Sequence, residues 1–233
     1  ETISDEIKNY INNEMSPGSI VILENLRFNP GEKKNDTEFA KQLASLADVY
    51  VNDAFGSSHR AHASISGVTQ FLPSVAGYLL KKEVEVLSSL LENPKRPFIA
   101  VLGGSKVSDK IHVIQNLLGK VDVLILGGGM TYTFLKAKGY EIGKSIREEE
   151  QLKYSLDMIE LAKKNKVKLM LPVDIVVARE FSENSESKNV DINSIPKDWE
   201  GMGIGEKTVE LYKSEISKAG TIFWNGPMGV FEF

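Results

Sequence analysis

The residues that could do chemistry begin with two lysines that follow a pair of glycines. The stretch GGSKVSDK, residues 103–110, ends an apolar run and places Lys106 and Lys110 four residues apart. Residues at this spacing share one side of a helix, and free amides at a helix N-terminus bind anions. The stretch therefore predicts a phosphate-binding turn, although it lacks the GxxxxGK[ST] spacing of a P-loop. The alternative is a tight turn with two solvated lysines.

Two more glycine turns follow predicted strands. The stretch LGGGMTYTFL contains Gly127–Gly129, and the stretch WNGPMGVFE contains Asn225 and Glu232. Ligands of open α/β sheets bind beyond the carboxyl ends of the strands, so we expect the turns to form one floor for a nucleotide or a sugar phosphate. A carboxylate such as Glu232 suits ribose hydroxyls. The alternatives are close packing for the glycines and an exposed acid for Glu232.

The first part of the chain carries cations instead of glycine turns. Arg27 follows one predicted strand, and His59 and Arg60 follow the next. Arginine and imidazole groups at strand ends can clamp a carboxylate or a phosphate. The three residues together predict a small-anion site, whereas each alone would be read as a salt bridge or an ordinary hydrogen-bonded side chain. His112 lies in a predicted helix and is given no role.

Composition excludes several classes of protein. The chain has 233 residues, a formal net charge of −4 and no cysteine. Disulfide scaffolds and thiolate metal sites are therefore excluded, and a nucleic-acid partner is not expected without a basic excess. No apolar run approaches the roughly 18 residues that a membrane helix needs. We expect a cytoplasmic protein with small-molecule partners and no membrane contact.

The elements that must position these residues alternate between strands and helices. Most of the strands are apolar at consecutive positions, which is typical of a parallel sheet buried on both faces. This alternation predicts an α/β fold. The predicted strands are residues 20–25, 48–53, 98–103, 121–127, 167–172, 175–178 and 220–224.

Helical patterns lie between the strands. Asn35 is predicted to cap a helix whose apolar face is Phe39, Leu43, Leu46 and Ala47. A second helix spans about 148–164, with Leu152, Leu156 and Ile159 as its apolar stripe.

A longer helical pattern, 73–94, lies between two prolines, and it is either a crossover or a helix that joins two domains. Its apolar stripe is Leu79, Val86, Leu87, Leu90 and Leu91. The polar segment 182–189 is predicted to be a solvated loop.

Taken together, these segments resemble the phosphoglycerate kinase family along essentially the whole chain. The motifs occur in the order ENLRF, DVYVNDAFGSSHRAHAS, GGSKVSDK, LGGGMTYTFLKAKGYEIG, LPVDIVVA and WNGPMGVFE. The resemblance implies a monomer with two Rossmann-like lobes, each with a parallel sheet, joined by a helical hinge. It assigns 1–72 to the N-terminal substrate-binding lobe, 73–93 to the hinge and 94–233 to the nucleotide-binding lobe. We expect both ends to be cut, which leaves both lobes incomplete.

The family reaction moves a phosphoryl group between 1,3-bisphosphoglycerate and Mg-ADP, giving 3-phosphoglycerate and Mg-ATP. By motif, Arg27 and Arg60 would bind the triose phosphate with His59 beside them, Lys106 would reach the transferring group, and Lys110 would bind the nucleotide phosphates. The adenosine slot would be shaped by Gly104, Gly128, Gly129, Gly201, Met202 and Pro227. Asn225 would lie near the phosphates and Glu232 would accept the ribose hydroxyls.

The resemblance also implies what this stretch of sequence lacks. The aspartate that holds the metal in the family is outside it, so we assign no metal ligand, and Mg²⁺ would come with ADP or ATP. The 233 residues alone are expected to be inactive or nearly so.

Two other functions remain open from the residues alone. A nicotinamide dehydrogenase would need GxGxxG with an acid about 20 residues on, and GGSKVSDK has no third glycine at that spacing. A binding module that has lost its chemistry is the second alternative. The presence of Lys106, Lys110 and Glu232 together argues against it.

Overall fold

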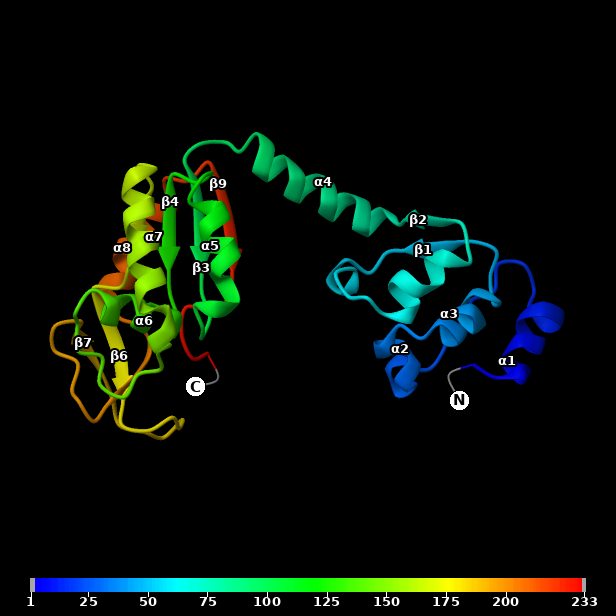
Figure 1. The fold of residues 1–233 in the computed structure, drawn as a ribbon, viewed down its shortest axis with the longest axis horizontal. Helices are drawn as coiled ribbons and strands as arrows, with labels where there is room; N and C mark the ends of the chain where they lie inside the picture. Colours follow the sequence, from blue (N-terminus) through cyan, green and yellow to red (C-terminus); the bar gives the residue numbers. More distant parts are fainter. Residues whose placement is uncertain (1–2, 232–233) are drawn as a thin grey trace. The chain divides into compact units, whose positions relative to one another are not determined.

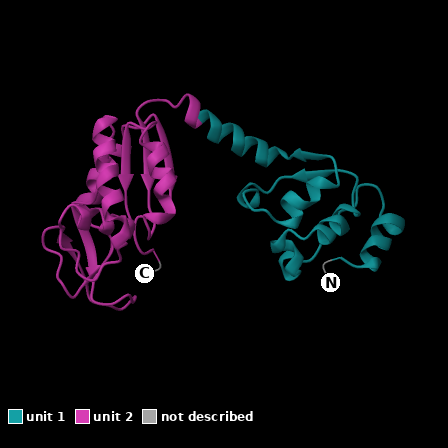
Figure 2. Cartoon of the chain, viewed as in Figure 1, with its two compact units in different colours: residues 1–89 teal, residues 90–233 magenta. Residues whose placement is uncertain are grey.

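The chain forms two compact units. The computed structural model describes residues 3–231, and the units comprise 1–89 and 90–233 (Figure 2). The division falls inside the long helix α4 (Tyr78–Glu92). The predicted hinge at 73–93 overlaps this helix, and its role as a hinge stays a prediction.

The first unit consists of short helices and one small parallel sheet. Strand β1 (Tyr50–Asn52) pairs in parallel with β2 (Ser74–Ala76). Its core is a cluster of Phe39, Ala40 and Ala63. The helices are α1 (Asp5–Asn9), α2 (Pro30–Lys34) and α3 (Thr37–Ala44), with π-helical turns at Tyr10–Glu14 and Ala63–Gly67 and 3-10 turns at Leu26–Phe28, Phe55–Ser57 and Val68–Gln70.

The predicted strand at 20–25 is wrong. Residues 19–25 have no regular secondary structure, and Ile20 and Ile22 are 86% and 89% exposed. A strand needs a neighbour that accepts and donates its ladder of hydrogen bonds. Among the described residues, β1 and β2 pair only with each other, so this apolar segment has no strand beside it.

The predicted cap of α3 is wrong by one residue. Asp36 is the cap, because the Phe39 amide donates to its Oδ1 at 2.8 Å. Asn35 instead ends α2 with a φ of 53°, a left-handed conformation that asparagine adopts more readily than most residues. The buried face of α3 is Phe39, Ala40 and Ala44.

The long helix begins later than its pattern indicates. Ser74–Ala76 belongs to β2, and α4 starts at Tyr78. No residue of α4 is buried, and Leu79, Val86 and Leu91 of its predicted stripe are each about half exposed.

The second unit is built on a parallel four-stranded sheet. Its order is β5-β4-β3-β9, formed by β3 (Phe98–Leu102), β4 (Val123–Leu126), β5 (Lys168–Met170) and β9 (Thr221–Asn225). Every residue of β3 and β4 is buried, which confirms the expected α/β class. Figure 1 shows β3, β4 and β9 side by side with parallel directions.

Helices cover this sheet through two apolar clusters. One joins Phe98 and Leu102 of β3 to α5 (Ile111–Leu117), α6 (Met130–Ala137) and α7 (Leu152–Lys164). The other joins Ile99 and Val101, which alternate with them along the strand, to Tyr212 of α8 (Glu206–Ile216). The central strands are therefore enclosed on both faces, and their carboxyl ends are held in fixed positions.

Two helix predictions need correction in detail. The helix predicted at 148–164 begins with a 3-10 turn at Glu149–Gln151, and the residues that it buries are Ser155, Met158 and Ala162. Leu156, predicted in the apolar stripe, is 43% exposed. The helix after Lys106 likewise opens with a 3-10 turn at Ser108–Lys110 before α5.

A second, antiparallel sheet was not predicted. Its order is β7-β6-β8, with β6 (Asp174–Ala178), β7 (Ser187–Asp191) and β8 (Glu200–Ile204). The predicted loop at 182–189 therefore contains the start of a strand. Polar Ser, Lys and Asn residues make β7 an edge strand with an exposed face, and such a strand has no apolar alternation to detect.

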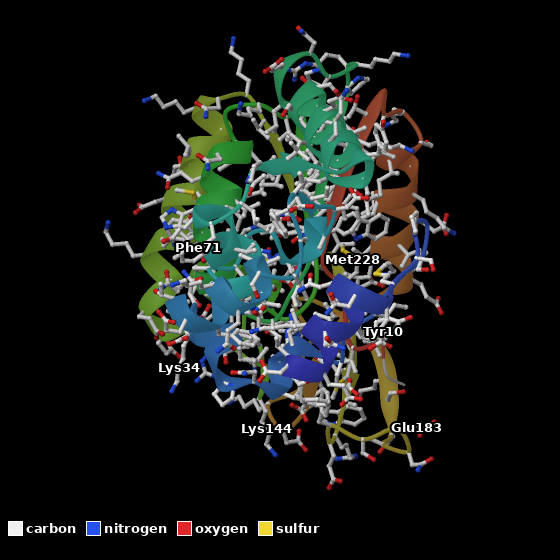
Figure 3. All side chains as sticks on the ribbon, turned by 90° about the vertical axis from the view of Figure 1, so that its right-hand side faces the viewer. Tyr10, Lys34, Phe71, Lys144, Glu183 and Met228 are labelled. Carbon is white, nitrogen blue, oxygen red and sulfur yellow. The ribbon has the colours of Figure 1, made fainter. Side chains whose placement is uncertain are left out.

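No helix in residues 3–231 is both long enough and apolar enough to span a membrane. Charged side chains such as Lys144 and Glu183 project outward from the surface of the second unit (Figure 3).

Candidate functional site

The three glycine turns of the second unit are hydrogen-bonded to one another. The Gly103 amide donates to the carbonyl of Asn225 at 2.9 Å, which joins the turns after β3 and β9. The Gly128 amide donates to the carbonyl of Met228 at 2.9 Å, which joins the turns after β4 and β9. The Met130 amide donates to the carbonyl of Gly104 at 3.0 Å. The structure therefore brings the ends of three neighbouring strands into one floor.

Two of these positions admit only glycine. A Cβ atom on Gly103 would lie 1.9 Å from the carbonyl oxygen of Pro227. Gly128 has a φ of +71°, and a Cβ there would lie 2.7 Å from the carbonyl oxygen of Gly104. Because the obstacles are backbone atoms, no rotamer change relieves them. The glycines are needed for the contact between turns, whether or not a ligand is bound.

A cleft of about 530 Å³ opens above this floor. Its opposite wall comes from β8 and from the segment after β9, which are joined by an antiparallel bridge between Gly203 and Gly229. The residues predicted for the adenosine slot all line it, namely Gly104, Gly128, Gly129, Gly201, Met202 and Pro227. The lining is mainly glycine and apolar side chains, which suits a flat aromatic ring better than a charged group.

Further residues of the cleft were not predicted from the sequence. They are Ser105, Ile146, Phe181, Glu200, Gly229, Val230 and Phe231. Ile146 and Phe181 come from loops between elements, so they carry no periodic signal. Gly201 is held in place by its backbone amide, which donates to Ser145 Oγ at 2.9 Å.

Lys110 and Asn225 are in contact next to the floor. The ammonium group of Lys110 donates a short hydrogen bond to Asn225 Oδ1. Asn225 is the last residue of β9 and is exposed. The contact places one cation beside the joined turns after β3 and β9, where an anionic group can meet it.

Lys106 is exposed and its ammonium makes no hydrogen bond or ion pair with the described residues 3–231. It adjoins Ser105 of the cleft lining. Lys106 is thus an exposed cation beside the cleft whose charge acts on the Glu148 carboxylate. Glu232, predicted to accept ribose hydroxyls, lies outside the described residues.

The amides that follow Lys106 are already occupied. The Ser108 amide donates to Glu148 Oε2 at 3.0 Å, and Ser108 Oγ donates to Glu148 Oε1 at 2.5 Å. The Val107 amide also donates to this carboxylate. The expectation that these amides are free to bind an anion is therefore wrong, because a carboxylate of the protein fills that place.

In the first unit, the three predicted anion-binding residues are all exposed. Arg27 lies in a 3-10 turn whose amide donates to Asn25 Oδ1 at 3.0 Å, and the Arg60 amide donates to Ser57 at 3.0 Å. Within residues 3–231 the side chains of Arg27, His59 and Arg60 have no hydrogen-bond or ion-pair partner. Their charges are available to a ligand, but no described contact joins the three side chains to one another.

A buried carboxylate ties the segments that carry these residues. Glu32 of α2 is 3% exposed and accepts from the Ser64 amide at 3.0 Å and from Ser64 Oγ at 2.6 Å. His62 Nδ1 lies 3.5 Å from Glu32 Oε1. Glu32 thus joins the helix just after Arg27 to the π-helical turn Ala63–Gly67 that follows Arg60. No sequence pattern indicated this role, because a lone glutamate in a charged helix reads as a solvent-facing residue.

We expect Glu32→Ala to lower the free energy of unfolding of the first unit by about 3 kcal/mol, since it leaves buried hydrogen-bond donors unpaired. Amide hydrogen exchange at Ser64 reports the loss directly. Glu38→Ala is the matched control, because Glu38 is an exposed glutamate on α3. Equal exchange at Ser64 in both variants would contradict the proposed tie.

The described residues do not by themselves form a metal site. No group of three or more Asp, Glu or His side chains within residues 3–231 is placed to hold a metal ion. The cations near the cleft, Lys106 and Lys110, suit phosphate oxygens.

The sequence of the chain matches known proteins of one family. The sequence model described as phosphoglycerate kinase matches residues 1–233. The chain is 54% identical to a phosphoglycerate kinase of Dictyoglomus turgidum over 232 residues, which is 100% of this chain and 58% of that protein. It is 56% identical to one of Moorella thermoacetica over 218 residues, or 94% of this chain and 56% of that protein.

Solved structures match as well. The phosphoglycerate kinase of Coxiella burnetii superposes with a TM-score of 0.77 at 48% identity, covering 91% of this chain and 57% of that one. That of Pyrococcus horikoshii gives 0.78 at 31% identity, covering 100% and 60%. In open α/β folds of this class, ligands bind beyond the carboxyl ends of the parallel strands. The chain belongs to the phosphoglycerate kinase family, and it spans 58% and 56% of the lengths of the two curated relatives.

Proposed function

We propose that this chain is part of a glycolytic phosphotransferase. The reaction is the reversible transfer of a phosphoryl group between 1,3-bisphosphoglycerate and ADP, giving 3-phosphoglycerate and ATP. The observation that carries the proposal is the joining of three glycine turns beneath an apolar cleft, with Lys106 and Lys110 at its side, in a chain of this family.

The second unit is proposed to bind the nucleotide. The flat base enters the cleft between Gly128 and Met202, where the lining is apolar. Lys110, oriented by Asn225, neutralises the nucleotide phosphates, and Lys106 reaches the transferring group. Glu232 accepts the ribose hydroxyls. Phosphoryl transfer depends on positioning and charge neutralisation more than on a covalent nucleophile, and the free cation of Lys106 provides such neutralisation.

The first unit is proposed to bind the triose substrate. Arg27 and Arg60 bind its phosphate or its carboxylate. A guanidinium group can donate two parallel hydrogen bonds to two oxygens of either group. His59 lies next to Arg60 and adds a third donor. Their lack of protein partners within residues 3–231 supports this role.

The segment 73–93 is proposed as the hinge between the units. The helix α4 that it contains crosses the division between them and has no buried residue. Closure about such a helix would exclude water from the reaction. We further propose a cytoplasmic monomer whose partners are its small-molecule substrates, with Mg²⁺ bound to ADP or ATP.

The test of the reaction is a coupled assay with 3-phosphoglycerate and ATP. A full-length phosphoglycerate kinase that carries these residues should turn over, and the 233 residues alone should show little or no turnover, since the curated relatives are longer. Comparable turnover by the short chain would contradict the second expectation. No turnover by the full-length protein would contradict the first.

We expect Lys110→Ala to weaken ADP binding by about tenfold, because a charge-assisted contact contributes roughly 1.5 kcal/mol. Isothermal titration of ADP into the 233-residue chain measures this change. Lys120→Ala is the control, since it removes the same charge from an exposed position on the loop before β4. Equal affinity for ADP in the two variants would show that Lys110 does not take part in ADP binding.

A further inference from the structure

Glu148 connects the segment just after the β3 glycine turn to α6, the helix that follows the β4 glycine turn. Its side chain accepts from the Val107 and Ser108 amides and from Ser108 Oγ. Its own amide donates to Thr133 Oγ1 at 3.1 Å. Thr133 is 1% exposed in α6, the helix that begins directly after Gly129. One residue therefore links the Lys106 turn to the helix that carries the neighbouring glycines.

The charge state of Glu148 supports a fixed arrangement. Burial alone would raise the pKa of Glu148, but the hydrogen bonds from Ser108 and Val107 and the charge of Lys106 lower it below its usual value. The carboxylate is therefore ionised at neutral pH and accepts three hydrogen bonds from the turn. Backbone amides bound in this way hold the turn in one conformation.

This arrangement has a consequence for Lys106. The amides next to Lys106 are satisfied by Glu148, so they do not compete with the lysine for a phosphate. The backbone on the far side of Lys106 is held by the Met130 amide, which donates to the carbonyl of Gly104 at 3.0 Å. The lysine backbone is thus fixed from both directions, while its ammonium stays free of hydrogen bonds in residues 3–231.

We propose that Glu148 is a positioning residue that holds the Lys106 turn in its reactive place. The proposal rests on the proposed function, because it assumes that Lys106 meets the transferring phosphoryl group. Glu148 does not touch the substrate. It acts through the backbone of Val107 and Ser108. Displacement of a reacting group by about 1 Å can lower a rate by about 10²-fold, so a loosened turn reduces the rate of the chemical step more than it reduces binding.

The test compares Glu148→Gln with Glu150→Gln in a full-length phosphoglycerate kinase that carries these residues. Both variants remove one negative charge near the start of α7, but Glu150 is exposed and has no described contact with the turn. We expect Glu148→Gln to lower kcat by roughly 10-fold to 100-fold with the KM for ADP nearly unchanged. Glu150→Gln is expected to leave both unchanged.

A second variant guards against a folding defect. Ser108→Ala removes only the hydroxyl donor and keeps the two amide bonds, so it is expected to lower kcat by several-fold, about what one lost hydrogen bond gives. Equal kcat for Glu148→Gln and Glu150→Gln would overturn the proposal. So would a loss in which KM for ADP rises as much as kcat falls, because that pattern shows a damaged binding site. If the unmodified enzyme fails to turn over, the proposed function fails instead.

Discussion

Replacing Lys106 with alanine is expected to lower kcat by about 10³-fold, while the KM for ATP changes little. The measurement is the steady-state rate in a full-length phosphoglycerate kinase that carries these residues, with 3-phosphoglycerate and ATP varied in turn. The expected split between kcat and KM follows from the role proposed for Lys106. An interaction that forms mainly in the transition state changes kcat, whereas uniform binding changes KM.

The structure gives the reason for so large an effect. The Lys106 ammonium is exposed and has no hydrogen-bond or ion-pair partner in residues 3–231. The backbone on both sides of the residue is held by Glu148 and by Met130. A free charge on a fixed backbone neutralises developing negative charge without reorganisation.

The control for Lys106→Ala is Lys164→Ala, which removes an exposed lysine at the end of α7 and should leave the rate unchanged. A rate for Lys106→Ala within a few-fold of the control would show that Lys106 does not act on the transferring group.

Gly128→Ala is expected to remove measurable ADP binding and to lower the free energy of unfolding of the second unit by about 4 kcal/mol. The new Cβ atom would lie within 3 Å of backbone atoms of Gly104 and Pro227, and the φ of +71° is itself unfavourable for alanine. The turns would have to move apart, and the floor of the cleft would open. Urea unfolding and an ADP titration measure the two effects.

Gly139→Ala separates the clash from the backbone strain. Gly139 also has a positive φ, +91°, but a Cβ atom there meets nothing within 4 Å. We expect this variant to lower the free energy of unfolding by only about 1 kcal/mol, the cost of the left-handed conformation for alanine. It should bind ADP normally. If Gly128→Ala and Gly139→Ala lowered the free energy of unfolding equally, the contact between the turns would contribute nothing to stability.

The sequence predicted the buried parallel sheet well, for a physical reason. Strands β3 and β4 are apolar at consecutive positions because helices cover both faces. The glycines that follow them were also recognisable, because no other residue allows the backbone contacts at Gly103 and Gly128. These features can be recognised from the local sequence, although the contacts that require them come from residues far apart in the chain.

The antiparallel sheet was missed because its two outer strands, β7 and β8, carry no periodic apolar signal, although a strand was predicted at 175–178 within β6. Four of the five residues of β7 are exposed, and β8 contains Gly201 and Gly203. A glycine in a strand usually reads as a loop. Here Gly201 is required because a Cβ atom would lie 2.2 Å from the Tyr132 ring, a contact between residues far apart in the chain.

The two carboxylates that organise the sites were missed for a similar reason. Glu32 and Glu148 lie in charged stretches, GEKK and REEE, where neighbouring glutamates and lysines are solvated. Their partners, Ser64 and Ser108, are 32 and 40 residues away. Only the fold distinguishes a glutamate that binds backbone amides from one that faces water.

We propose that the floor formed by the three joined turns binds a nucleotide through its phosphates and its base. The most direct measurement is a residue-resolved NMR titration of the 233-residue chain with Mg-ADP and, separately, with NADH. We expect saturable shifts with Mg-ADP, and no comparable response to NADH, at the amides of Gly104, Gly128, Gly129 and Gly201. Shifts confined to residues away from the cleft, or tighter binding of NADH there, would contradict it.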